Sequence, residues 1–222
     1  MPGNWWVENV IDNMGIVGLV SWTVAVIGSI VLHELAHGWA TISRGDRTPI
    51  ELGHMTWNPL VHMGPMSLAL FAFFGIAFGA MPVDPSRQRG RYASAYVAFA
   101  GPAMNLLIAA VFIVIGALVL NGRSMLGDPL GPNLQTFCFL IVFLNISLAL
   151  FNLIPVPPLD GWRILSDFVP EYGRLFESEN GRWIGIGLFV LVFIFAGDFI
   201  FGPGQFVASS WIPQVAGLLG GP

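Results

Sequence analysis

An apolar run over residues 15–42 places the strongest constraint on how this chain can fold. It reads GIVGLVSWTVAVIGSIVLHELAHGWATI, and its only ionisable side chains are His33, Glu34 and His37. A run of this length can span a bilayer as a helix, where ionisable side chains are costly unless they find partners. We therefore interpret these three residues as part of a functional site.

On a helix, His33 and His37 lie one turn apart and project from the same face, so both imidazoles can reach one metal ion. With Glu34 they form the H-E-x-x-H pattern of zinc hydrolases, in which the glutamate is the general base. The alternative is a pair of hydrogen-bonded structural histidines beside a paired glutamate. A catalytic zinc usually has three protein ligands, so the zinc interpretation requires one more ligand elsewhere in the chain.

Composition indicates an all-α polytopic membrane protein. The 222 residues are 55% hydrophobic and 10% charged, and their mean hydropathy is +0.73. We expect a single integral-membrane domain over residues 1–222, whose first helix serves as its own signal anchor. No basic patch suggests nucleic acid binding. The single cysteine, Cys138, excludes a disulfide framework, and we interpret it as a small core residue.

Apolar segments along the chain predict about four membrane crossings. The segment over residues 64–80 is also apolar, but it is short and interrupted by glycine and proline. We interpret the residues after 201 as an uncharged tail. The predicted crossings are residues 16–42, 95–120, 134–154 and 184–201.

A second informative stretch, NLIPVPPLDG over residues 152–161, follows the third crossing. Pro155, Pro157 and Pro158 cannot continue a helix. Non-helical backbone at membrane depth is tolerated only where it is buried in protein or lines a wet cavity. Asp160 comes directly after these prolines and is a candidate third metal ligand. The alternative is a solvated aspartate behind a helix-ending turn.

HELAH in an apolar helix followed by NLIPVPPLDG resembles the site-2 protease family of intramembrane zinc metalloproteases. The likeness is to compact bacterial members without PDZ or CBS domains, and it extends over residues 16–165. Three further stretches between the two motifs also resemble the family: GDRT at 45–48, TWNPLVH at 56–62 and AGPAMN at 100–105.

The resemblance implies that His33, His37 and Asp160 hold one Zn²⁺ per chain and that Glu34 is the catalytic base. The activity it implies is hydrolysis of peptide bonds within or near transmembrane segments of other membrane proteins, in regulated intramembrane proteolysis. Membrane-tethered regulators such as anti-sigma factors are the substrates that the family suggests. The family also implies a location in the bacterial inner membrane.

The same resemblance implies substrate-binding residues. Asn152 and the three prolines, Pro155, Pro157 and Pro158, would shape the site and hold an extended substrate strand. The roles of four other polar residues are open on the sequence: His54, His62, Asn105 and Asn145. The acids over residues 167–179 are interpreted as a solvated face.

A shared metal also constrains the topology. His37 and Asp160 reach one ion only if residues 64–80 do not cross the membrane, so we predict a re-entrant or membrane-surface element there; the alternative is a further span. Without that crossing, eight of the nine arginines lie on one side, which the positive-inside rule makes cytoplasmic. The site then opens toward the cytoplasm and the N-terminus lies outside. Those eight are Arg44, Arg47, Arg87, Arg89, Arg91, Arg163, Arg174 and Arg182.

Two other functions are compatible with the same residues. A metal-binding transporter could use the histidine and aspartate cluster for transit, although no inverted repeat is evident. A catalytically silent member could bind transmembrane segments without cutting them. Oligomeric state cannot be inferred from the sequence.

Overall fold

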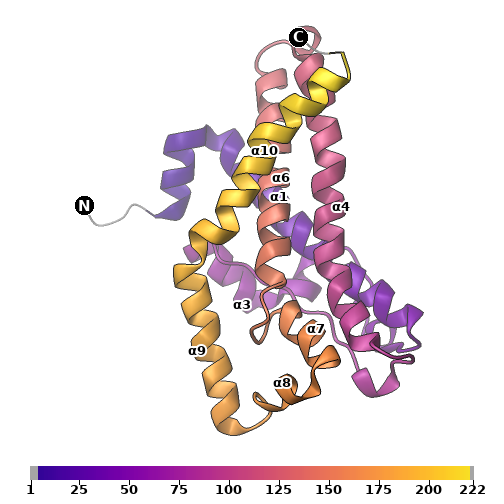
Figure 1. Ribbon diagram of the computed structural model, residues 1–222. Helices are drawn as coiled ribbons and strands as arrows, with labels where there is room; N and C mark the ends of the chain where they lie inside the picture. The colour runs from indigo at the N-terminus through magenta and orange to yellow at the C-terminus, as the bar shows by residue number, and fades with distance from the viewer. Residues whose placement is uncertain (1–4, 221–222) are drawn as a thin grey trace.

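The computed structural model describes residues 5–220, and the regular structure within that range is helical, without a strand (Figure 1). The all-α prediction is thereby confirmed. In chain order the helices are α1 (Trp6–Ser43), α2 (Thr48–Glu51), α3 (Pro59–Phe74), the 3-10 turn η1 (Pro85–Arg87), α4 (Ala93–Asn121), α5 (Arg123–Leu126), α6 (Leu130–Asn152), α7 (Asp160–Phe168), α8 (Pro170–Arg174), α9 (Glu179–Phe195) and α10 (Gly197–Leu218).

Three helices, α1, α4 and α6, are long and apolar enough to cross a membrane, and α9 with α10 can form a fourth, bent span. The bend between α9 and α10 is 50°. We expected a final crossing at 184–201 followed by a tail, but the chain bends at Ala196 and continues as α10. The chain is thus a polytopic membrane protein with three to four candidate spans.

A buried stripe of mostly small residues on α10 explains why this segment is a packed helix. Gly204, Ala208, Ile212 and Ala216 recur every four residues and are all buried. A Cβ on Gly204 would lie 2.4 Å from Ser147 Oγ on α6, so only glycine permits this approach. Small residues allow membrane helices to pack closely, and α10 lies across α4 and α6 (Figure 1).

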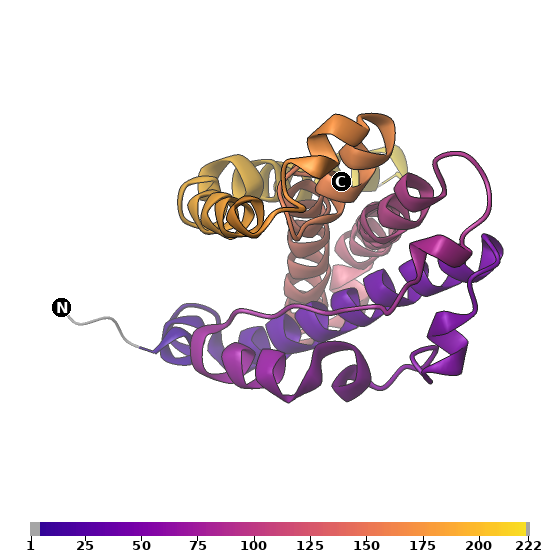
Figure 2. The same ribbon diagram turned by 90° about the horizontal axis from the view of Figure 1, so that it is seen from below.

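Residues 59–84 form a hairpin whose helix is shorter than the candidate membrane spans. Helix α3 has only 16 residues and is kinked at Gly64, where the backbone is not helical. Even an unbroken helix of that length would measure about 24 Å, whereas the hydrocarbon core is about 30 Å thick. It runs beside α1, and the chain then returns as an extended segment over residues 75–84 (Figure 2). Ala80 N donates to His62 O at 2.9 Å, and Ser67 Oγ bonds both N and O of Phe78.

The ends of the long helices gather at two levels. The C-terminal ends of α1 and α6 and the start of α4 lie at the lower end of Figure 1, together with α7 and α8. The C-terminal ends of α4 and α10 meet at the upper end, where Asn121 Nδ2 donates to Ala216 O at 3.0 Å. Arg123 follows α4 at the upper end, whereas the other arginines lie at the lower end, in the connections, in the short helices η1, α7 and α8 and in the first turn of α9.

Asp46, just beyond α1, ties the return segment to the end of that helix. The side chain is fully buried. Its Oδ1 accepts from Thr48 N and Oγ1, and its Oδ2 accepts from Asp84 N at 2.7 Å. Burial alone would raise the pKa of Asp46, but the hydrogen bonds from Thr48 and Asp84 outweigh it and hold that pKa below its usual value.

Asp46→Asn should destabilise the fold in a pH-dependent way. The new NH₂ group faces a donor, which should lower the free energy of unfolding by about 1–3 kcal/mol. Because the pKa of Asp46 is lower in the folded chain, its contribution is complete above the unfolded pKa and is lost as the pH falls through the folded one. In detergent, the midpoint temperature of thermal unfolding should therefore be higher for wild type than for the variant at neutral pH. The two midpoint temperatures should converge below about pH 4. An equal separation at neutral and acidic pH would contradict this account.

Candidate metal centre

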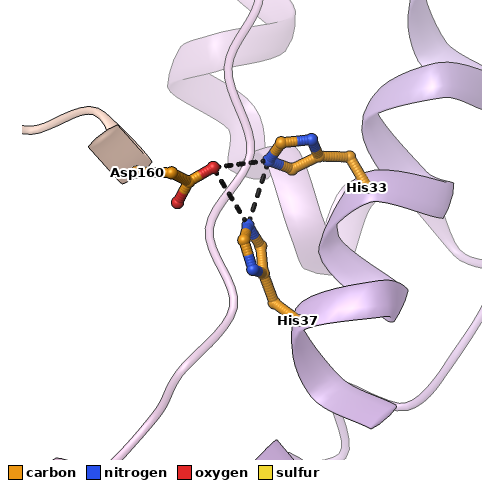
Figure 3. Close-up of side chains that lie close together, drawn as sticks. All are labelled: His33, His37 and Asp160. Carbon is orange, nitrogen blue, oxygen red and sulfur yellow. Dashed lines mark hydrogen bonds and ion pairs between the residues drawn. The ribbon is translucent and has the colours of Figure 1, made fainter. Parts of the chain in front are cut away.

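Two helices bring three potential ligand atoms together. His33 and His37 project from one face of α1, and Asp160 is the first residue of α7 (Figure 3). The two Nε2 atoms are 3.0 Å apart and lie 3.2 and 3.4 Å from Asp160 Oδ2. Among residues 5–220, these form the only group of three or more His, Cys, Asp or Glu side chains close enough to share a metal ion.

A relay of hydrogen bonds determines which nitrogen of His33 carries its proton. The carbonyl of Ile141 can only accept, so the NH₂ of Asn145 must face it, at 2.9 Å; this group also donates to Ser29 Oγ. The oxygen of Asn145 then accepts from the NH₂ of Asn105, which turns Asn105 Oδ1 toward His33 Nδ1 at 2.6 Å. His33 therefore donates from Nδ1 and keeps a lone pair on Nε2.

His37 is oriented in the same way by α4. Its Nδ1 lies 2.8 Å from the carbonyl oxygen of Val97, which can only accept, so its Nε2 also keeps a lone pair. Asp160 Oδ2, buried and without a donor among the described residues, is the third acceptor. Three acceptors facing one another in a buried site require a cation or a proton between them.

The spacing of these atoms suits zinc. Ligand atoms at about 2.0–2.1 Å from a tetrahedral zinc lie about 3.3 Å from one another. The observed separations of 3.0–3.4 Å match this value. Two neutral imidazoles and one carboxylate are also a ligand set found in catalytic zinc sites. The residues present therefore fit the metal that the sequence predicts.

Helix α4 passes so close to the imidazoles that only glycine fits at position 101. A Cβ on Gly101 would lie 2.4 Å from His37 Nε2 and 2.5 Å from His33 Nε2. Gly101 and Asn105 are four residues apart and share one face of α4. The AGPAMN stretch thus combines a glycine that makes room for the ligands with an asparagine that orients one of them.

A cavity of about 620 Å³ lies beside the three ligand atoms, and Glu34 lines it with them. Glu34 is buried, and the return segment passes directly against it. A Cβ on Gly79 would lie 2.7 Å from Glu34 Oε1. The side chain expected to act as the base therefore lies at the boundary between α1 and the extended backbone of the hairpin.

The four residues expected to bind substrate divide into two pairs. Asn152 and Pro158 line the cavity, and Asn152 Nδ2 donates to Leu148 O at 3.0 Å. By contrast, the carbonyl of Pro155 accepts from Tyr172 on α8, and Pro157 packs against Gly185 of α9.

The remaining histidines stand apart from the centre. His62 is buried, with its Nε2 2.7 Å from Thr56 O. Its ring lies edge-on to that of His54, with centroids 6.2 Å apart. The sequence alone left the roles of Asn105 and Asn145 open; both belong to the relay that orients His33. The sequence signal for both residues was a polar amide side chain inside an otherwise apolar predicted crossing, 95–120 for Asn105 and 134–154 for Asn145.

Comparison with known proteins points to one family. The family model of peptidase family M50 matches residues 21–130 and 127–195 of this chain. "Putative zinc metalloprotease YwhC" of Bacillus subtilis (strain 168) is 33% identical over 175 residues, which are 77% of this chain and 78% of that protein.

Two mycobacterial proteins are also similar. "Putative zinc metalloprotease Rip2" of Mycolicibacterium smegmatis is 32% identical over 154 residues, which are 66% of this chain and 56% of that protein. "Zinc metalloprotease Rip1" of Mycobacterium bovis is 34% identical over 121 residues, 48% of this chain and 30% of that protein. The chain thus spans little more than half of Rip2 and less of Rip1. No solved structure matches the chain significantly.

Gly101→Ala should abolish metal binding, because the new methyl group would overlap both Nε2 atoms. Gly28→Ala on α1 is the matched control, since a Cβ there meets nothing within 4 Å. Metal content of the purified proteins, measured by elemental analysis, should fall in Gly101→Ala and not in Gly28→Ala. Wild-type metal content in Gly101→Ala would show that the two imidazoles do not form the centre.

Proposed function

The chain belongs to peptidase family M50, and on this premise we propose that it is an intramembrane zinc endopeptidase. It is a membrane metalloprotease of the site-2 protease type, and zinc is its metal. We propose that it cuts peptide bonds within or near transmembrane segments of other membrane proteins. The observation that carries this proposal is the convergence of three acceptor atoms beside Glu34 in the apolar part of the fold.

In the proposed site, His33 and His37 bind zinc through Nε2 and Asp160 binds it through Oδ2. When bound, zinc supplies a Lewis acid that polarises the scissile carbonyl and acidifies water. Glu34 takes the proton of the attacking water and delivers it to the leaving amide nitrogen. Asn105 and the carbonyl of Val97 keep both imidazoles in the tautomer that can bind a metal.

Substrate binding is proposed to use extended backbone. A transmembrane helix buries its peptide bonds in its own hydrogen bonds, so a substrate must unwind before it can be cut. Asn152 uses its NH₂ within α6, which leaves its oxygen to accept from the substrate backbone in the cavity. Pro158 shapes the same wall, while Pro155 and Pro157 support the loop from behind through α8 and α9.

Glu34→Ala and Asp160→Ala should separate catalysis from metal binding. In detergent, wild type should hold one zinc per chain and cleave a model transmembrane substrate. Glu34→Ala should keep the zinc and lose at least about 100-fold in cleavage rate, whereas Asp160→Ala should lose both. Glu177→Ala, an exposed acid, is the control.

Other outcomes would contradict specific parts of this proposal. Retained zinc and unchanged cleavage in Asp160→Ala would remove Asp160 from the site. Zinc without cleavage in wild type would support a silent binder of transmembrane segments. Zinc flux into vesicles that survives Glu34→Ala would support a transporter.

We further propose that residues 1–222 act as one integral-membrane domain in the bacterial inner membrane, with the site open to the cytoplasm. The excess of arginine at the end that carries the centre supports this orientation. Membrane-tethered regulators such as anti-sigma factors are the substrate class we propose, from the family resemblance.

Cysteine labelling tests the orientation. In a Cys138→Ser background, Ser86→Cys reports on the connection before α4 and Ser124→Cys on α5 after it. A membrane-impermeant thiol reagent added to intact cells should label Ser124→Cys and should label Ser86→Cys only after lysis. The opposite pattern would reverse the proposed orientation, and equal labelling would contradict the crossing by α4.

A further inference from the structure

Helix α7 carries the proposed zinc ligand Asp160 as its first residue, at the end of a chain segment with little regular structure. Residues 153–159 before it form a proline-rich loop. A ligand on a loop end is precise only if something else sets the direction of the helix behind it. The helix against which α7 packs most extensively is α4.

Asp167 makes a directed contact between these two helices. It lies seven residues after Asp160, so the two side chains share one face of α7 two turns apart. Asp167 Oδ2 accepts from Ala95 N, in the first turn of α4, at 2.8 Å. Beside it, Phe168 stacks on Tyr92, with ring centroids 4.5 Å apart.

The contact with Asp167 supplies a hydrogen-bond acceptor for the N-terminus of α4. The first N–H groups of a helix have no partner within it and are usually capped by a side chain of the preceding residue. That residue is Tyr92, which makes no such hydrogen bond. Asp167 provides the missing acceptor from another helix, and its negative charge lies at the positive end of the α4 dipole.

The same helix α4 holds both imidazoles. Val97 O orients His37, Asn105 orients His33, and Gly101 lies against both rings. The contact between Asp167 and Ala95 therefore ties α7, which carries Asp160, to the same helix that orients the two histidines. The sequence predicts Asp167 to be one of several solvated acids; the structure instead separates it from Glu171, which pairs only with Arg174 on the surface.

We propose that Asp167 is a positioning residue, which docks α7 on the N-terminus of α4 and so directs Asp160 toward the two histidines. This inference rests on the proposed zinc site. It predicts an effect on metal affinity and ligand geometry that goes beyond the loss of one helix cap. Loss of a contact that orients a metal ligand typically weakens metal binding by about 10–100-fold.

The test compares full-length proteins purified in detergent, with zinc alone as the probe. Asp167→Ala should bind zinc at least about tenfold more weakly in competition with a chelator. The absorption spectrum of its cobalt-substituted form should also change, because the carboxylate ligand is displaced. Asp167→Asn retains an accepting oxygen and should recover most of the affinity.

Ser178→Ala is the matched control. Ser178 Oγ accepts from Gly181 N at the start of α9, so this variant also removes one helix cap, but from a helix without a proposed ligand. It should lower thermal stability and leave zinc affinity and the cobalt spectrum unchanged. Equal loss of zinc affinity in Ser178→Ala and Asp167→Ala would reduce Asp167 to a general stabilising residue and overturn the proposal.

Asp167→Glu serves if Asp167→Ala does not fold. It keeps the charge and the acceptor but adds a methylene between them and α7, so it should weaken zinc binding as well. Wild-type zinc affinity and spectrum in folded Asp167→Ala or Asp167→Glu would overturn the proposal while leaving the zinc site intact. An absence of zinc in wild type would instead refute the proposed function.

Discussion

Three lone pairs that converge in an apolar environment are the feature on which the rest of this structure depends. His33 Nε2, His37 Nε2 and Asp160 Oδ2 face one another without a donor between them. Buried acceptors repel one another unless a cation or a proton separates them. The surrounding hydrogen bonds make the arrangement more demanding, because Asn105 and Val97 commit both Nδ1 protons elsewhere. The fold therefore holds its ligand atoms ready for a metal ion.

Helix α4 is the common support of this arrangement. Gly101 allows its backbone to approach the imidazoles, and Asn105 connects His33 through Asn145 to α6. Helix α10 packs on α4 and α6 through Gly204, Ala208 and Ala216, with Ile212 between the two alanines. Small residues recur at these contacts because helices in a membrane associate by close packing and hydrogen bonding rather than by a hydrophobic driving force.

The return segment shows how a membrane protein can contain extended backbone. Its polar groups bond to α3 through His62 and Ser67, and Asp46 holds its far end outside the apolar region. Backbone at membrane depth must be satisfied in this way or face a wet cavity. The bonded groups of Phe78 and Ala80 meet the first condition, and residues 76–81 line the cavity beside Glu34.

Much of this could be predicted from the sequence, because hydropathy and motif spacing are local. The lengths of the apolar runs predicted α1, α4 and α6, and the four-residue spacing predicted that His33 and His37 share a face. The requirement of a common metal predicted the approach of Asp160 to the histidines and a re-entrant or membrane-surface element over residues 64–80. The long helices, the shared face and the approach of Asp160 agree with the structure, because hydrocarbon permits few ways to satisfy an ionisable side chain or a backbone amide.

Only the tertiary structure determined how these parts are held. Asn145 and Asp167 act across helices far apart in the chain, and no local pattern distinguishes a residue that bonds a neighbouring helix from one that faces water. Helix α10 was interpreted as a tail for the same reason, since its glycine and proline content lowers helix propensity while its packing stripe depends on α4 and α6. The sequence by itself determined which groups could not remain unpaired in the membrane; the fold decided which partners they found, because hydrogen bonds between helices depend on distance and direction in space.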